Sequence, residues 1–303
     1  MLRWLAVLAA LIAAPAAAQE TIEAEIVKLW PGAPPGHGRP NGPEKVGASD
    51  SAKGAVTNVT EPRMEIYRPA KPNGAAALVI GGGGYFRIQI GSAARPVART
   101  LLARGVTVAV LYYRLPGDGW NADAPFQDGQ RAMRLLRADA KRLGIDPKRI
   151  GAIGSSAGGH LAGILATRGA HDFYPRIDTV DAQPATPNFA GLIYPVVSMR
   201  APIDTTRTKR ELDELPNYRD AYSVEAHVTA DTPPIFLAHS ADDPIAHVDH
   251  SLRLFAAMQA AKRPAELHVF QTGGHSWGLG KPGTPVAEWP RLLINWAGAN
   301  GWF

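Results

Sequence analysis

Residues 149–163 of this chain read RIGAIGSSAGGHLAG. An apolar run, a cluster of small residues and a pattern with helical spacing follow one another, which predicts a strand, a tight bend and a helix. The bend has the form Gly-x-Ser-x-Gly, with Gly154 and Gly158 on either side of Ser156. A serine at such a bend has a strained backbone conformation that projects its hydroxyl out of the turn. The residues two positions before and after it lie so close to neighbouring backbone that only glycine fits. The spacing therefore predicts Ser156, not Ser155, as a nucleophile; the alternative is a small-residue turn where a helix packs closely on a sheet.

Strands and helices are expected to alternate on both sides of this bend. Continuous apolar runs at 106–116, 188–198 and 232–243 are typical of strands buried on both faces, and the longest helical pattern covers 124–143. Alternation of this kind predicts an α/β fold, with a mostly parallel central sheet and helices on both faces. Ligands bind such sheets at the carboxyl ends of the strands, which is where the bend lies.

The N-terminus is typical of a secretory signal peptide. A short basic start precedes the apolar run WLAVLAALIAA, which is short for a membrane span, and APAAAQE then supplies small residues for cleavage. We therefore expect residues 1–18 to be removed after Ala18 and the protein to be periplasmic or secreted. The alternative is an uncleaved N-terminal anchor.

The remaining residues, 19–303, are expected to form one α/β domain. The chain of 303 residues is 46% hydrophobic, which suits a single large core. Residues 19–60 are rich in proline and glycine and predict an irregular N-terminal arm. Residues 200–230 are polar and break the alternation, which indicates an insertion near the active-site face.

Composition excludes several kinds of site. The chain has no cysteine, so it has no disulfide, thiol nucleophile or cysteine zinc site. The net charge of +5 is spread along the chain, which indicates solubility rather than nucleic-acid binding. The nearest approach to metal-ligand spacing is His247-Val248-Asp249-His250, which a helix start explains. We therefore expect no metal and no cofactor.

A serine nucleophile needs a base and an acid, which in this fold class follow it in the order acid, then histidine. His275 lies in QTGGHSWG, a glycine-flanked loop directly after the expected strand AELHVF, and is the predicted general base. The acid is expected in the loop ADDPIAH after the strand IFLAHS, where Asp242 and Asp243 compete. The alternative for either aspartate is a structural role in a turn, since Asp-Asp-Pro is a sequence that favours turns.

The stretch IGGGGYF predicts a loop whose bare backbone approaches the substrate. A nucleotide-binding interpretation fails because Arg87 stands where a dinucleotide fingerprint needs glycine, and no Gly-Lys-Ser/Thr is present. The stretch instead predicts an oxyanion hole, built from the N–H groups of Gly83 and Gly84 with that of Ala157 after the nucleophile.

Four segments together resemble the α/β-hydrolase esterase/lipase superfamily, most of all its acetylesterase (xylan esterase-like) branch. They are GGGGYF, GIDPKRIGAIGSSAGGHLAG, TPPIFLAHSADDPIAHVDHS and AELHVFQTGGHSWGL, and the likeness runs from about Val59 to Trp296. The family spacing places the acid four residues after His239, which selects Asp243. The resemblance thus implies a triad of Ser156, Asp243 and His275.

The chain departs from these relatives at positions that shape the substrate site. Relatives usually carry a bulky residue where Ser155 stands, and Val-Pro where this chain has Ala246-His247. Lipase-type relatives carry histidine where this chain has Gly81. None of these departures removes a catalytic group.

The sequence therefore predicts an exported serine carboxylesterase that hydrolyses short acyl esters, above all acetyl groups on carbohydrate, through an acyl-serine intermediate. Tyr85, Trp120 and Trp277 are candidates for stacking on a sugar ring, with core packing as the alternative. The expected partner is a small-molecule or carbohydrate ester, without nucleic acid or stable membrane insertion. Two alternatives remain. The first is a serine hydrolase of another kind, such as a peptidase of the prolyl-oligopeptidase type, although residues 19–60 are too few to form the propeller domain of those enzymes. The second is a catalytically silent binding protein.

Overall fold

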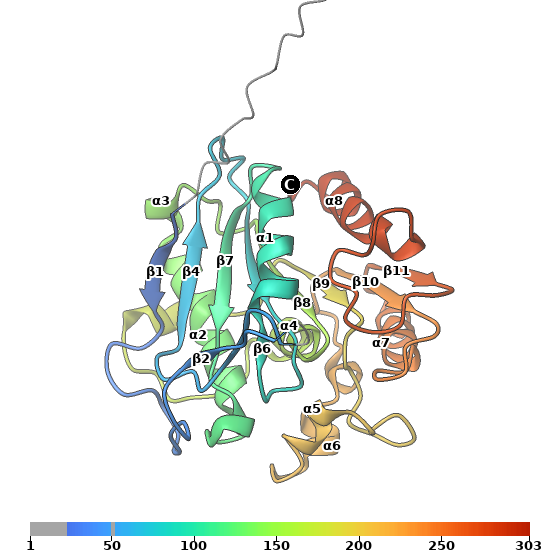
Figure 1. The fold of residues 1–303 in the computed structure, drawn as a ribbon. Coiled ribbons are helices and arrows are strands. Elements are labelled where there is room, and N and C mark those ends of the chain that lie inside the picture. The colour runs from blue at the N-terminus through green and yellow to red at the C-terminus, as the bar shows by residue number, and fades with distance from the viewer. Residues whose placement is uncertain (1–22, 50–51) are drawn as a thin grey trace, which may run out of the picture.

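The computed structural model describes residues 23–49 and 52–303. The expected signal peptide, residues 1–18, lies outside these described residues. Figure 1 shows one central sheet, with α1 (Arg95–Leu102) in front of it and α2 (Ala124–Ala138) and α4 (Ala157–Arg168) behind it.

The central sheet has eight strands in the order β1-β4-β7-β5-β8-β9-β10-β11. In chain order these strands are β1 (Glu25–Lys28), β4 (Arg63–Tyr67), β5 (Ala76–Ile80), β7 (Thr107–Tyr112), β8 (Ile150–Ser155), β9 (Phe189–Ile193), β10 (Ile235–Ser240) and β11 (Ala265–Phe270). The pairs β1–β4 and β4–β7 are antiparallel, and every pair from β7 to β11 is parallel. The predicted mostly parallel sheet is confirmed.

Helices cover both faces of the sheet because parallel strands need crossover connections. The remaining helices are α3 (Ala140–Leu143), α5 (Arg207–Arg210), α6 (Tyr218–Ala221), α7 (Asp249–Ala260) and α8 (Trp289–Ala299). Every residue of β5, β7, β9 and β10 is buried, which explains the continuous apolar runs of these strands. In the described part of the chain, none of the helices combines the length and the apolar character needed to cross a bilayer.

The helix expected over 124–143 is divided in two. Asp139 has φ −88° and ψ 5°, which ends α2 and begins the short α3. Gly144, with φ +68°, then closes the segment as a left-handed cap, a conformation that favours glycine.

The N-terminal arm is more regular than its composition indicates. β1 pairs with β4 at the edge of the central sheet, and β2 (Lys45–Val46) and β3 (Ala55–Thr57) form a small antiparallel sheet with β6 (Ile88–Gln89). Trp30 is buried and donates a hydrogen bond from Nε1 to Asp128 at 2.8 Å. These strands are too short to show a period in the sequence, and they form because their partner strands supply the hydrogen bonds.

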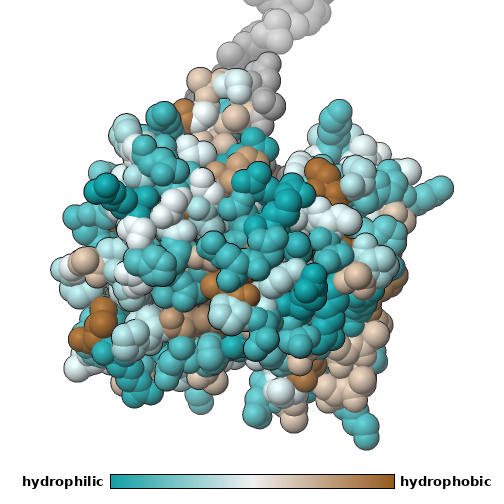
Figure 2. Space-filling view, turned by 90° about the horizontal axis from the view of Figure 1, so that it is seen from below, coloured by the Kyte–Doolittle hydropathy of each residue, from teal (hydrophilic) through white to brown (hydrophobic). Residues whose placement is uncertain are grey.

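Residues 200–230 contain α5, α6 and the helical turn η4 (Val224–His227). The other turns are η1 (Ile90–Ala94), η2 (Pro116–Asp118), η3 (Thr179–Ala182) and η5 (Pro285–Glu288). Figure 1 shows α5 and α6 at the lower end of the molecule, the end toward which β7 runs. Figure 2 views the molecule from that end, and the surface there is mostly hydrophilic, with separate small hydrophobic patches.

Candidate active site

Ser156 lies at the carboxyl end of β8, directly before α4. Its φ of +53° and ψ of −120° lie in a region that side-chain-bearing residues rarely adopt. A Cβ at Gly154 would collide with the carbonyl oxygen of Gly158, and a Cβ at Gly158 would collide with that of Ile80. The bend therefore needs glycine at both positions, which is the physical reason for the Gly-x-Ser-x-Gly pattern.

Three residues that are far apart in the sequence form one hydrogen-bonded chain beside this bend. The Ser156 Oγ lies 2.9 Å from His275 Nε2, and His275 Nδ1 lies 2.6 Å from Asp243 Oδ2. An ionised carboxylate can only accept, so His275 Nδ1–H donates to Asp243 and leaves Nε2 free to accept from the Ser156 hydroxyl. The arrangement can remove a proton from Ser156 and store it on the ring.

The Asp243 carboxylate is fully buried and held by several donors. Its Oδ1 accepts from the backbone N–H groups of Ile245 at 2.8 Å and Ala246 at 2.9 Å. Burial raises the pKa of Asp243, but hydrogen bonds from His239 and His275 outweigh this effect and hold that pKa well below its usual range. Asp243 is therefore ionised at neutral pH despite its burial.

Asp242, the competing aspartate, lies one residue away and has a different contact. Its Oδ1 accepts from the backbone N–H of Gly274 at 2.8 Å, in the loop that carries His275. The structure thus places Asp243 against the imidazole, and Asp242 against the backbone of the loop.

His239 supports Asp243, a role that its sequence position did not reveal. Its Nε2 lies 3.2 Å from Asp243 Oδ2 and 2.9 Å from the carbonyl oxygen of Ala246, and its Nδ1 lies 2.7 Å from Ser251 Oγ. The Nε2–H therefore donates to both Asp243 and the carbonyl oxygen of Ala246, and Nδ1 accepts from the Ser251 hydroxyl. The sequence signal for this contact is the spacing of four residues between His239 and Asp243. With this spacing, the loop after β10 turns back so that Asp243 meets His239 at the end of the strand.

The glycine loop lies directly on Ser156. A Cβ at Gly82 would come within 2.8 Å of Ser156 Cβ. Gly83 and Gly84 have φ of +128° and +64°, which favours glycine. Among the described residues, no acceptor is hydrogen-bonded to the backbone N–H of Gly83, Gly84 or Ala157. Ala157 is the first residue of α4, so its N–H has no partner within the helix.

The structure separates the three aromatic candidates, and the stacking role expected for Tyr85 is wrong. The Tyr85 ring is fully buried, and its hydroxyl donates to His160 Nδ1 at 2.8 Å. The backbone turns at this residue, with φ +63°, and directs the ring into the core. No substrate can therefore stack on it.

Trp120 and Trp277 lie in different surroundings. The Trp120 Nε1 donates to the carbonyl oxygen of Val59 at 3.0 Å, which holds the ring against the chain that leads into β4. The Trp277 ring packs edge-on against Tyr194, with centroids 4.5 Å apart, and Tyr194 in turn lies 4.9 Å from the His275 ring. Trp277 is thus connected to the catalytic histidine candidate through one intervening ring.

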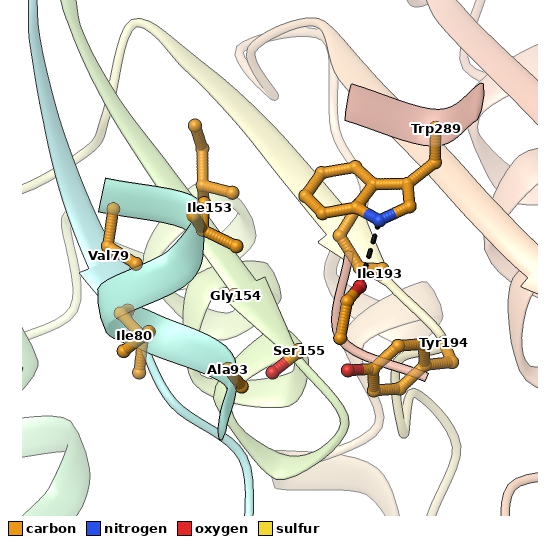
Figure 3. A pocket seen from close by; sticks show the side chains of 12 residues that line it. Val79, Ile80, Ala93, Ile153, Gly154, Ser155, Ile193, Tyr194 and Trp289 are labelled. Atoms are coloured by element: carbon orange, nitrogen blue, oxygen red, sulfur yellow. Dashed lines mark hydrogen bonds between the residues drawn. The ribbon is translucent and has the colours of Figure 1, made fainter. Parts of the chain in front are cut away.

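A small apolar pocket lies behind the bend, on the face covered by α1 and α8 (Figure 3). Its volume of about 10 Å³ is on the scale of one water molecule. Figure 3 shows Ser155 and Tyr194 at one side of the pocket. The small Ser155 leaves this space open at the position where relatives were expected to carry a bulky residue.

The segment His247-Val248-Asp249-His250 does not converge on one point. The His250 ring is buried and accepts hydrogen bonds from the backbone N–H groups of Val197 and Ser198, whereas His247 is exposed. Within residues 23–49 and 52–303, no group of three or more histidine or carboxylate side chains is arranged to hold a metal ion.

A buried histidine ties the glycine loop to the nucleophile helix. His160, on α4, accepts from the Tyr85 hydroxyl at Nδ1 and donates from Nε2 to the carbonyl oxygen of Tyr222 at 2.7 Å. Burial lowers the pKa of His160 to about 4 and that of His250 to about 3. Both rings are therefore neutral in the folded protein throughout the physiological range.

This burial predicts that stability falls in mild acid. Between pH 6.5 and 5, unfolded histidines bind protons that folded His160 and His250 do not, so protonation favours unfolding. Carboxylates titrate mainly below this range. We expect the melting temperature to fall as the pH is lowered from 6.5 to 5, and to fall less in His160→Gln, which has no group to protonate there. Thermal unfolding followed by circular dichroism measures this, and a constant wild-type melting temperature would contradict it.

Comparison with known families and curated proteins gives consistent matches. The BD-FAE family model matches residues 64–258. The chain is 28% identical over 226 residues to an acetylxylan esterase of Xylanibacter ruminicola, covering 72% of this chain and 44% of that protein. It is 33% identical over 137 residues to an ethyl acetate hydrolase of Pseudomonas putida, covering 44% of this chain and 40% of that protein. The chain spans less than half the length of these curated relatives.

Solved structures match over nearly the whole chain. The acetyl ester-xyloside bifunctional hydrolase of Caldicellulosiruptor lactoaceticus is 31% identical, with a TM-score of 0.77 and coverage of 94% of this chain and 100% of that chain. Esterase 2 of Thermogutta terrifontis, in a form phosphorylated by paraoxon, is 25% identical, with a TM-score of 0.67 and coverage of 86% and 95%.

Proposed function

This chain belongs to the BD-FAE family and has the α/β-hydrolase fold, and from that premise we propose that it is an exported serine carboxylesterase that removes short acyl groups, above all acetyl groups, from carbohydrate. One observation carries the proposal: Ser156, His275 and Asp243 form a continuous hydrogen-bonded chain at the carboxyl end of β8. Similarity to an acetylxylan esterase and to an acetyl ester-xyloside hydrolase supports acetylated carbohydrate as the substrate class.

Acylation begins when Ser156 Oγ attacks the ester carbonyl carbon. His275 Nε2 takes the hydroxyl proton, and Asp243 stabilises the resulting imidazolium through its hydrogen bond to Nδ1. The carbonyl oxygen becomes an oxyanion, and the backbone N–H groups of Gly83, Gly84 and Ala157 donate hydrogen bonds to it. Each such donor contributes about 3 kcal/mol of transition-state stabilisation. The positive end of the α4 dipole, at Ala157, acts in the same direction.

The tetrahedral intermediate then expels the alcohol. The bond between the carbonyl carbon and the alcohol oxygen breaks, and this oxygen takes the proton from His275 Nε2. An acyl-serine ester at Ser156 remains. Water repeats the sequence with His275 as the base, and the second collapse releases the carboxylic acid and restores the Ser156 hydroxyl.

The proposal also assigns the parts of the chain. Residues 1–18 act as a signal peptide that is removed after Ala18, and residues 19–303 form a single domain that works in the periplasm or outside the cell. Within this domain, residues 200–230 border the substrate site. The contact between Arg207 and the glycine loop supports this assignment, because a Cβ at Gly84 would lie 3.1 Å from the Arg207 stem.

The experiment that tests the substrate class is a release assay on defined esters. Acetate, butyrate and ferulate esters of the same sugar are offered to the protein, and the released acids are measured. We expect acetate to be released fastest, and release by the Ser156→Ala protein to fall on the order of 10⁵- to 10⁶-fold. Faster release of ferulate would replace the acetyl assignment, and release by Ser156→Ala at a rate near that of the wild type would remove the mechanism.

A further inference from the structure

Two arginine side chains border the glycine loop that we assign to the oxyanion. The guanidinium of Arg87 lies over the Phe86 ring at 5.0 Å from its centroid, and that of Arg207 lies 5.1 Å from the same centroid. One arginine comes from the loop itself, and the other comes from α5, in residues 200–230. Segments distant in the sequence thus place two cations on one aromatic ring.

Both side chains pack against the glycine loop, and a Cβ at Gly84 would lie 3.1 Å from the Arg207 stem. A Cβ at Gly83 would lie 2.9 Å from Arg87 Cγ, and the carbonyl oxygen of Gly83 accepts from the Arg87 backbone N–H at 3.3 Å. Gly82, the preceding residue, lies against Ser156. Arg87 therefore packs on the loop that lies beside the nucleophile.

The two guanidiniums differ in how they are neutralised. Arg207 forms an ion pair with Glu211 one helical turn away. Arg87 has no carboxylate within ion-pair distance among the described residues, and its Nε is buried without an acceptor. A partly buried cation with an unpaired N–H is unfavourable, because the group has lost hydration without gaining a partner. A bound anion would supply both the charge and the acceptor.

We propose that Arg87 binds a carboxylate on the alcohol part of the substrate, so that the substrate class is an acetylated acidic sugar of the uronic-acid type. The inference rests on the proposed function, because an acetyl group carries no charge and the anion must then belong to the alcohol. A guanidinium presents two parallel N–H groups that match the two oxygens of a carboxylate.

The test compares two substrates that differ only in charge. The substrates are the methyl glycosides of glucose and of glucuronic acid, the second with a free carboxylate, acetylated at the same position. Their hydrolysis is measured at low and high salt. We expect wild-type kcat/KM to favour the glucuronide at low salt, and this preference to shrink as salt screens the contact. Arg87→Gln should lower the ratio of the two kcat/KM values by about 10- to 100-fold, the range expected for a hydrogen bond to a charged group.

Two further variants control the result. Arg87→Lys keeps the charge but loses the paired N–H geometry, so it should retain part of the preference. Arg99→Gln, on the exposed side of α1, should leave both the ratio and the activity unchanged. Melting temperatures of all variants separate loss of binding from loss of folding.

A binding measurement separates this inference from the proposed function. Isothermal titration of the Ser156→Ala protein with methyl glucuronide and methyl glucoside needs no turnover. The subsite is supported if the Ser156→Ala protein binds the glucuronide more tightly than the glucoside and if the added substitution Arg87→Gln removes this difference. This result supports the subsite even if no ester is hydrolysed. Equal binding of both sugars, or a wild-type enzyme that hydrolyses both acetates equally well, overturns the subsite and leaves the esterase proposal intact.

Discussion

Replacing Ser156 with alanine is expected to lower kcat for nitrophenyl acetate on the order of 10⁵- to 10⁶-fold, because no other group can form the acyl intermediate. His275 and the glycine-loop N–H groups would remain, so a small rate above that of water is expected to persist. Release of nitrophenolate, followed by absorbance, measures the effect.

The neighbouring serine supplies the matched control. Ser155 differs from Ser156 by one position and lines the small pocket, whereas the hydroxyl of Ser156 lies 2.9 Å from His275 Nε2. Ser155→Ala should therefore retain most of the activity. A fluorophosphonate reagent should label the wild-type protein and Ser155→Ala, but not Ser156→Ala. A wild-type protein that takes no label would support the catalytically silent alternative.

Asp243→Asn is expected to lower kcat/KM by about 10³- to 10⁴-fold. The carboxylate can only accept from His275, whereas an amide can donate to Nδ1 and favour the tautomer that carries its proton on Nε2. In that tautomer, Nε2 cannot accept from the Ser156 hydroxyl, and the developing imidazolium loses its counter-charge. The measurement is the steady-state hydrolysis of nitrophenyl acetate at neutral pH.

Asp242→Asn is the control for this change, since it makes the same substitution one residue earlier. Its side-chain oxygen can still accept from the Gly274 N–H, so the His275 loop should keep its shape and the activity should stay close to wild type. The melting temperature of each variant shows whether the loss reflects folding. If Asp242→Asn caused the larger loss, the assignment of Asp243 would be wrong.

Much of the fold could be predicted because its signals are local. Buried parallel strands are continuous apolar runs, helices between them show their own period, and the bend at Ser156 can be built only with glycine on both sides. The predicted mostly parallel sheet with helices on both faces is confirmed, as is the resemblance to α/β-hydrolase esterases. β1 was missed because an edge strand of four residues owes its form to β4, its hydrogen-bonding partner.

In the candidate active site, too, local features could be predicted from the sequence and long-range contacts could not. Neighbouring residues alone identified the strained bend, the loop position of His275 and the bare glycine backbone, because each depends on local geometry. The resemblance to known esterases selected Asp243, and the structure places this side chain against the imidazole. Only the tertiary structure decided that Tyr85 points into the core and that Arg87 has no acidic partner among the described residues. Those facts depend on side-chain direction and on segments that meet only in the folded chain, which sequence spacing does not encode.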